Sequence, residues 1–358
     1  MGAGPAGSAA AMSLQQFRGV EVLLLERGTF PRRKPCGSGL SPWALAVLDR
    51  MGVGPRIRAE AYPIRAARIG GANLEPIELR GRYEAAIYSR SDFDMLLARE
   101  AARRGAVLRE GVRVEELVRH DGRLIGVRTS AGTIEADAAI VCNGASSTLA
   151  PAPRPGTTLN SIMGWYEGVE DVSDAVELYF DPPVRPYYGW LFPESRGRVN
   201  IGICYAPTPG APNARERFHE FVEMRFARRL RGAARIDRLI GHPIATTRKP
   251  TALVQDGTLL AGEAVRLVDP ATAEGIYSAL ESGLISGRVL GSVLDAGHPP
   301  SPTRLAPYTQ MVRQRLGRRL VAGDVLLKVL GTPLLDIALR LGSMKPVRTA
   351  LTWALAHA

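Results

Sequence analysis

The chain has 358 residues, enough for two or three compact domains, so its length excludes a short peptide or a fibrous repeat. Hydrophobic residues make up 46% and charged residues 23%, values that exclude bulk disorder. The formal net charge is +11, and residues 301–358 carry +7 of it, with nine bases against two acids.

The sequence also lacks several common signals. No apolar run reaches the roughly 18–20 residues of a spanning helix, and there is no signal-peptide pattern, so a cytoplasmic protein is expected. Cys36, Cys142 and Cys204 are too few and too widely spaced for a disulfide framework or zinc-ligand pairs. The five histidines fall at no metal spacing and near none of the motifs below, so we expect surface or loop roles for them and no metal site.

The first predicted elements are a glycine turn, a helix and a buried parallel strand. Gly2, Gly4 and Gly7 form a Gly-x-Gly-x-x-Gly segment, which permits a tight turn, close approach of a pyrophosphate and close helix packing. Glu26 ends the apolar run from Val20, where its carboxylate is placed to accept hydrogen bonds from a ribose. This pattern predicts a dinucleotide site. Such a fingerprint normally follows a strand, so we also expect a first strand to be missing before residue 1.

Further along the chain, helical spacing over 92–105 precedes strands over 106–117 and 138–142. A Pro- and Gly-rich crossing at 151–157 leads into an aromatic, β-rich block. An amphipathic helix is predicted over 214–239, and its arginines are typical of a solvated helix face, not of a nucleic-acid site. The α/β pattern returns at 258–262 and continues into a helix over about 275–294. Pro-rich residues 299–307 open a helical tail.

Four segments resemble a known family. Arg90-Ser-Asp-Phe-Asp94 and the stretch from Leu260 to Ile276 resemble two FAD-binding motifs of the aromatic-hydroxylase-like flavoproteins. Lys34–Gly39 resembles the Cys-Gly loop of the geranylgeranyl reductase family within that superfamily. Tyr188–Pro193 resembles its Tyr-x-Trp-x-Phe-Pro motif, which lines a prenyl channel. The resemblance covers residues 1 to about 295, with the motifs in the expected order.

The resemblance implies roles for individual residues. FAD would be held by Gly2, Gly4, Ala6, Gly7, Glu26, Cys36, Gly37, Gly39, Arg90, Val114, Gly262, Glu263, Gly275 and Ile276. Tyr188, Trp190 and Phe192 would face the substrate, although the same alternation is typical of an ordinary core strand. Cys36 is the candidate catalytic residue, and positioning by its loop backbone explains the segment equally well.

The implied fold class is α/β, with a discontinuous Rossmann-like FAD-binding domain (1–60, 85–150 and 250–298), an inserted β-rich substrate domain (61–84 and 151–249) and a helical C-terminal region (299–358). The implied function is reduction of C=C bonds of an isoprenoid chain by hydride from reduced FAD, with NAD(P)H or another electron donor. A halogenase or monooxygenase of the same superfamily is the alternative, and a non-catalytic flavin or lipid carrier is another.

The expected partner is a prenyl-chain molecule or lipid, with no nucleic acid. The basic, leucine-rich segment 301–358 suggests a peripheral contact with the inner membrane surface, and an ordinary helical cap on the FAD-binding domain remains open.

Overall fold

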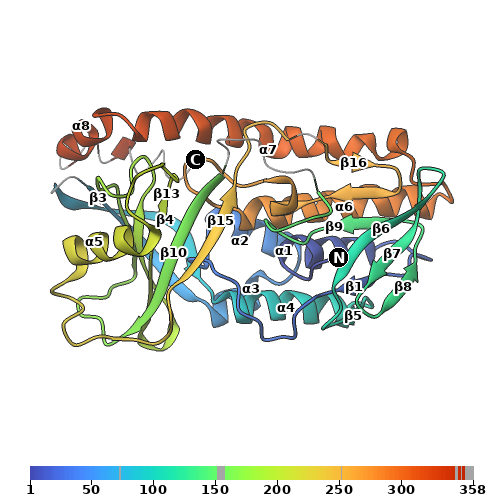
Figure 1. The fold of residues 1–358 in the computed structure, drawn as a ribbon, viewed down its shortest axis with the longest axis horizontal. Helices are drawn as coiled ribbons and strands as arrows, with labels where there is room; N and C mark the ends of the chain where they lie inside the picture. Colours follow the sequence, from blue (N-terminus) through green and yellow to red (C-terminus); the bar gives the residue numbers. More distant parts are fainter. Residues whose placement is uncertain (72–73, 151–157, 251, 343–345, 348, 351–358) are drawn as a thin grey trace.

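The computed structural model describes residues 1–71, 74–150, 158–250, 252–342, 346–347 and 349–350. Two parts lie side by side, and the long helix α7 runs along one edge of both (Figure 1). The predicted crossing at 151–157 and most of the chain after residue 342 lie outside the described residues.

The first part contains two small parallel pairings. Strand β1 (Leu23–Leu25) pairs with β5 (Val107–Arg109), and β9 (Ala139–Val141) pairs with β17 (Thr258–Leu260), which also pairs with β16 (Val254–Gln255). The backbone of the first two residues lies between these groups. Gly2 N donates to Leu25 O (2.7 Å), while Cys142 N donates to Met1 O (2.9 Å). A three-stranded antiparallel sheet stands beside them: β6 (Val114–His120), β7 (Arg123–Thr129) and β8 (Gly132–Glu135).

Helices α1 (Pro5–Leu14) and α6 (Ile276–Asp295) pack closely along a seam where the α6 residues in contact with α1 are glycines. A methyl group placed on Gly283 would lie 2.2 Å from Ala6 O, and one on Gly287 would lie 2.5 Å from Ala10 O. Glycine spacing of four residues therefore lets the two backbones touch. The remaining helices of this part are α2 (Pro42–Arg50), α3 (Gly54–Glu60) and α4 (Arg90–Arg103), with a 3₁₀ turn η2 at Gly262–Val265.

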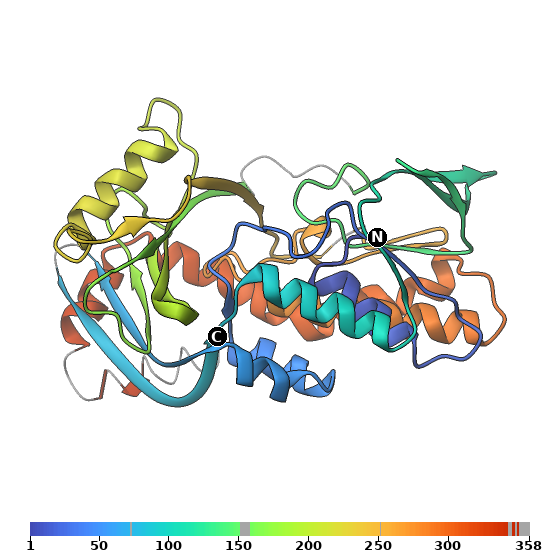
Figure 2. The same cartoon turned by 90° about the horizontal axis from the view of Figure 1, so that it is seen from below.

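The second part is built on a nine-stranded sheet. Its order is β14 (Ala234–Arg235), β10 (Thr158–Glu167), β13 (Arg198–Tyr205), β12 (Gly189–Pro193), β11 (Ala175–Tyr179), β3 (Tyr62–Gly71), β4 (Leu74–Ile87) and β2 (Gly39–Leu40), with β15 (Ile240–Ala245) also paired to β10. Only the β11–β3 pairing is parallel among these. A 3₁₀ turn, η1 (Ser195–Gly197), joins β12 to β13. Seen from below, β4 is long and strongly curved (Figure 2).

Helix α5 (Ala214–Phe226) covers one face of this sheet with buried Phe218, Phe221 and Phe226. The prediction of a helix over 214–239 is therefore wrong at its C-terminal end. The helix ends at Phe226; beyond it the guanidinium of Arg229 pairs with the buried carboxylate of Glu177, and residues 234–235 pair with β10.

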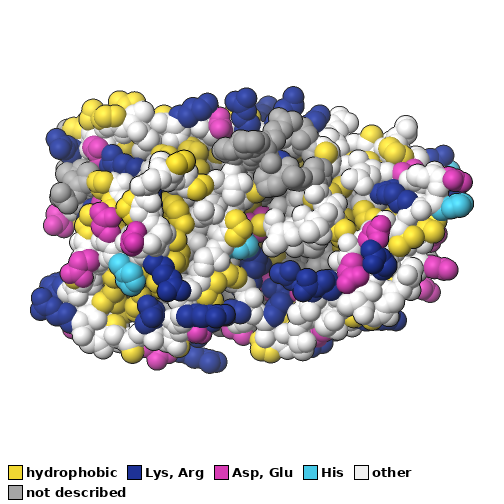
Figure 3. Space-filling model, in the orientation of Figure 1, with side chains coloured by type: hydrophobic (Ala, Val, Ile, Leu, Met, Phe, Trp, Pro, Cys, Tyr) yellow, Lys and Arg dark blue, Asp and Glu magenta, His cyan; other side chains and the backbone are white. Residues whose placement is uncertain are grey.

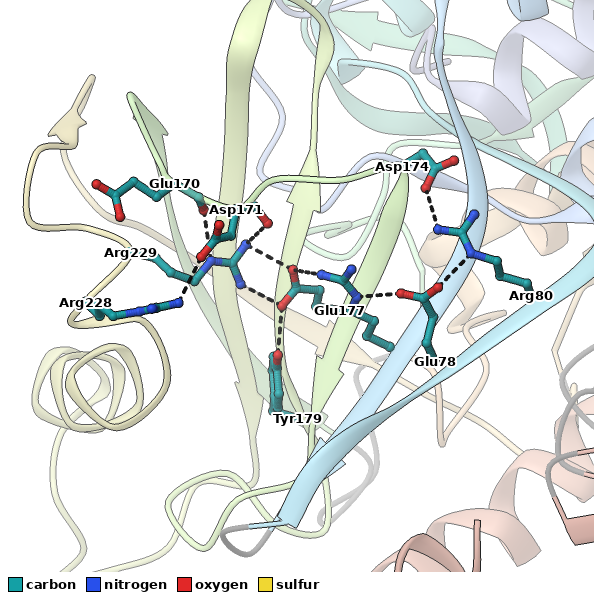
Figure 4. Close-up of polar contacts among 10 residues, drawn as sticks. Glu78, Arg80, Glu170, Asp171, Asp174, Glu177, Tyr179, Arg228 and Arg229 are labelled. Carbon is teal, nitrogen blue, oxygen red and sulfur yellow. Dashed lines mark hydrogen bonds and ion pairs between the residues drawn. The ribbon is translucent and has the colours of Figure 1, made fainter. Parts of the chain in front are cut away.

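A polar network ties the turn after α5 to the sheet (Figure 4). Glu177 is 1% exposed and accepts hydrogen bonds from Arg229 Nη1 (2.9 Å), Arg229 Nη2 (3.1 Å) and the Tyr179 hydroxyl (2.7 Å). Arg68 Nη1 lies 3.7 Å from the same carboxylate and links it to Glu78. A buried carboxylate with this many donors is a structural anchor, because removing any partner would leave charge unpaired.

The tail contains two helices, α7 (Pro302–Leu330) and α8 (Leu334–Leu341). One face of α7 packs on the first part through Leu305, Tyr308, Val312 and Leu316, and the Tyr308 hydroxyl donates to Leu260 O (2.8 Å). The bidentate pair between Arg185 and Asp336 fastens α8 to the second part. Within the described residues, no helix has both the length and the apolar character needed to cross a membrane.

Candidate functional site: a cavity shared by both parts

One cavity of about 1050 Å³ extends between the two parts. Fifteen of the seventeen residues predicted to contact FAD or substrate line it; the exceptions are Gly7 and Gly262. Those two pack the backbone behind the cavity. A methyl group on Gly7 would lie 1.9 Å from Gly2 O, and Gly262 has a φ of +64° and contacts Ala6.

The N-terminus of α1 opens into the cavity. Gly4 caps the helix without a side-chain hydrogen bond, and Pro5 occupies the first turn. The nearest side chains to a methyl group on Gly4 would be Arg32 (3.7 Å), Asp94 (3.9 Å) and Arg90 (4.0 Å). A helix N-terminus with free backbone N–H groups, next to guanidinium groups, is suited to bind a pyrophosphate.

Glu26 lies beside this turn, as its place in the sequence predicts. Its carboxylate is 4% exposed and accepts hydrogen bonds from Ala3 N (2.9 Å) and Gly28 N (3.0 Å). Arg32 Nε is 3.2 Å from the same group. These donors fix an ionised carboxylate at the cavity wall, where a ribose would meet it.

Arg90 and Asp94 form a buried bidentate pair within α4, with Nε–Oδ1 and Nη2–Oδ2 distances of 2.7 and 2.9 Å. Burial opposes the charge of Arg90, but Asp94 and the nearby Cys36 sulfur raise its pKa overall. Arg32 Nη2 is 3.0 Å from Asp94, and the buried Arg32 Nε has no hydrogen-bond partner within hydrogen-bonding geometry. Arg32 was missed in the sequence, where it appears only as one of three consecutive bases before Pro35.

The Cys36 loop lies against strand β12. Ser38 N is 3.3 Å from Cys36 Sγ, and a methyl group on Gly37 would be 2.9 Å from the ring of Phe192. Trp190 rests on Gly202 of β13, and its Nε1 donates to Asn200 Oδ1 (2.6 Å). Glycine at position 37 is therefore required for the loop to touch the aromatic strand, and each ring is held in one orientation.

Residues of the second FAD-binding motif also line the cavity. Gly275 caps α6 without a side-chain hydrogen bond, and Gly275 and Ile276 line the cavity, as do Val114 and Gly39. The Tyr188 hydroxyl donates to the carbonyl of Thr272, just before this helix. Burial raises the pKa of Tyr188 well above its ordinary value, so the phenol stays protonated.

Glu263 meets two residues that were not predicted with it. Lys34 Nζ and His242 Nε2 are each 3.6 Å from its carboxylate, and they are 2.7 Å from each other. The expectation that every histidine lies away from the motifs is thus wrong for His242. Strand β15 carries it into the cavity, and pairing between distant strands leaves no local signal in the sequence.

Beyond β12 the cavity becomes an apolar compartment. It is lined by Ile64, Ile69, Ile77, Leu79, Val176, Leu178 and Phe180 from the sheet region, and by Leu326, Val329, Leu330, Leu334, Leu335 and Leu339 from α7 and α8. None of these side chains offers a hydrogen bond. This compartment is suited to a long hydrocarbon chain.

Comparison with known proteins decides the family. A family profile described as an FAD binding domain matches residues 1–322. The menaquinone reductase of Mycolicibacterium smegmatis is 31% identical over 82% of this chain and 75% of its own. The digeranylgeranylglycerophospholipid reductase of Methanothrix thermoacetophila is 27% identical over 89% of this chain and 83% of its own. The chain belongs to the geranylgeranyl reductase family of FAD-dependent oxidoreductases.

Solved structures agree with this family in fold. A geranylgeranyl bacteriochlorophyll reductase-like protein from Thermoplasma acidophilum superposes with a TM-score of 0.86, at 22% identity, over 96% of this chain and 90% of its own. A flavin-dependent brominase gives 0.81, at 17% identity, over 99% of this chain and 92% of its own. The predicted α/β fold and FAD as cofactor are confirmed. The uncapped helix ends and the Glu26 carboxylate at the cavity wall fit FAD.

Proposed function

We propose that this oxidoreductase reduces C=C bonds in the prenyl chain of a lipid or lipid-like molecule. The continuity of one cavity carries the proposal, since residues of both FAD fingerprints and a purely apolar compartment share its wall. When bound, FAD supplies the hydride for the alkene, after reduction by NAD(P)H or another donor.

The chain's own contribution is positioning. Tyr188, Trp190 and Phe192 project between the FAD side and the apolar compartment, with successive ring centroids 6.2 and 6.1 Å apart. Such rigid rings can hold an alkene in one orientation at little conformational cost, and the apolar walls exclude water. The backbone of the Cys36 loop, pressed against Phe192, fixes the boundary between the two compartments.

The test is anaerobic reduction of the FAD-loaded protein with light, followed by addition of a geranylgeranyl lipid. Alkene-dependent reoxidation of the flavin, with a product heavier by two hydrogens for each bond reduced, is the expected result. Oxygen with halide forming a halogenated product would favour the halogenase alternative. If neither addition reoxidises the flavin with formation of a product, the chain is a binding protein.

We further propose that α7 and α8 contact an anionic membrane surface. Leu335 and Leu339 face the apolar compartment, while Ile337 and Leu341 of the same helix are 51% and 45% exposed and do not line it. Figure 3 shows hydrophobic side chains over α8 and basic ones along the edge formed by α7. A short helix that is apolar on both sides and flanked by bases suits the boundary between a lipid layer and the cavity.

Vesicle cosedimentation tests this contact. Ile337→Glu with Leu341→Glu should reduce binding to anionic vesicles at low salt, whereas the matched change Ile125→Glu, at an exposed site on β7, should not. Equal binding to neutral and anionic vesicles, or equal loss in both variants, would remove the membrane from the proposal.

A further inference from the structure

Lys34, His242 and Glu263 reach the cavity from three segments distant in sequence. Lys34 lies in the loop after β1, His242 in β15 of the nine-stranded sheet, and Glu263 in η2 of the first part. Lys34 Nζ is 2.7 Å from His242 Nε2, and each of these nitrogens is 3.6 Å from a different oxygen of Glu263. Their side chains are 22%, 15% and 19% exposed, so the cluster is largely shielded from solvent.

The donor and acceptor roles follow from the groups. A lysine ammonium has only donors, so the 2.7 Å contact requires His242 Nε2 to accept, with the imidazole neutral and its proton on Nδ1. Burial favours the neutral acid of Glu263, but the nearby charges of Lys34 and Arg90 lower its pKa. The carboxylate is thus ionised.

The distances show an incomplete ion pair. A direct hydrogen-bonded contact between an ammonium and a carboxylate is about 2.7–2.9 Å long, well short of the 3.6 Å seen here. Lys34 is bonded to His242 instead. The oxygens of Glu263 are therefore still able to accept other hydrogen bonds. Glu263 stands where, in the second FAD-binding motif that this segment resembles, an acid holds the ribityl chain.

We propose that His242 is a positioning residue of the FAD site: by holding Lys34 to one side, it keeps the Glu263 carboxylate available to the hydroxyl groups of the FAD ribityl chain. This extends the FAD site into the nine-stranded sheet, which neither fingerprint reaches. The inference depends on FAD binding and not on the identity of the reduced substrate.

Protonation of His242 should disrupt this arrangement. The imidazolium could no longer accept from Lys34, and it would place a second cation 3.6 Å from Glu263. Arg90 and Asp94 of α4 and Cys36 of the same loop face Lys34, and Arg90 also faces Glu263. On β10, the uncharged Ser161 Oγ donates to the His242 carbonyl (3.1 Å). FAD affinity should therefore be lower when His242 is protonated than when it is neutral.

The test measures the FAD dissociation constant of apoprotein by quenching of flavin fluorescence, together with the melting temperature of the apoprotein. His242→Leu should weaken FAD binding about tenfold or more, the usual scale for losing a hydrogen bond to a charged group. His242→Gln retains an acceptor, so it should bind nearly as the unmodified protein does and lose the pH dependence between pH 5 and 8. His219→Gln, at an exposed site on α5, is the matched control.

A double-mutant cycle separates positioning from general destabilisation. In a Lys34→Met background the competing ammonium is gone, so His242→Leu should cost little further FAD affinity. The proposal is overturned if His242→Leu lowers the melting temperature without changing the dissociation constant. It is equally overturned if the loss persists in full in the Lys34→Met background, or if His242→Gln keeps the pH profile of the unmodified protein.

Discussion

Two glycines of the first fingerprint should respond differently to the same change. A methyl group on Gly7 would lie 1.9 Å from Gly2 O and 3.1 Å from Gly2 C, both backbone atoms that no rotamer change can move. Overpacking of this kind costs up to about 3 kcal/mol, whereas glycine to alanine inside a helix gains about 1 kcal/mol. Gly7→Ala should therefore destabilise the apoprotein by about 2 kcal/mol.

Gly4→Ala should leave the apoprotein nearly unchanged. Gly4 has a φ of −80°, and its nearest neighbours would be flexible side-chain ends at 3.7 Å or more. The added methyl group projects to where a pyrophosphate must approach the backbone, so FAD binding should weaken, and Gly4→Leu should abolish it. Urea unfolding of the apoproteins and FAD titration give the two quantities. Equal loss of stability in both alanine variants, or full FAD occupancy in Gly4→Leu, would refute this reasoning.

Three other predictions concern the cavity wall. Burial raises the pKa of Cys142 to about 11 and also raises that of Cys204, so iodoacetamide at pH 8 should modify Cys36 alone. Bound FAD should slow this reaction. Peptide mass spectrometry measures the labelling of each cysteine, and early labelling of Cys142 would contradict the prediction. The pKa of Glu263 is lowered to about 2, so its ionised form stabilises the folded protein by roughly 3 kcal/mol above the ordinary carboxyl pKa, and this stabilisation is lost as the pH falls toward 2. The difference in unfolding free energy between the unmodified protein and Glu263→Gln should therefore shrink between pH 6 and pH 3. A constant difference would contradict the lowered pKa. Gly37→Ala should displace the Cys36 loop from Phe192 and slow alkene-dependent flavin reoxidation while FAD remains bound. An unchanged reoxidation rate would show that the contact between the loop and Phe192 does not affect the reaction.

Much of the FAD side could be predicted from local sequence. The glycine turn before α1, the apolar period of α4 and the uncapped start of α6 each depend on residues within a few positions of one another. The aromatic alternation of β12 is equally local, which is why Tyr188, Trp190 and Phe192 were found to line the cavity.

The parts that could not be predicted depend on pairing between distant segments. His242 enters the cavity because β15 pairs with β10 in a register that sets His242 opposite Ser161. Ile77 and Leu79 stand in β4 among charged residues, and only the register with β3 and the contact with α8 make them part of the apolar compartment. Just beyond the end of α5 at Phe226, Arg229 bonds to Glu177, which lies 52 positions before it and which no local pattern connects to it.

The seam between α1 and α6 bears on how mutations in this protein should be interpreted. The two helix N-termini that face the cavity are spaced by backbone contacts at Gly283 and Gly287, and by Gly291, where a methyl group would lie 2.2 Å from the ring of Phe17. Because the Ala6 and Ala10 backbone atoms beside Gly283 and Gly287 cannot rearrange, a substitution at either glycine must push the helices apart. A screen for flavin loss would then identify positions one to four turns away from the cofactor, and would score them as binding residues although they only set the width of the site.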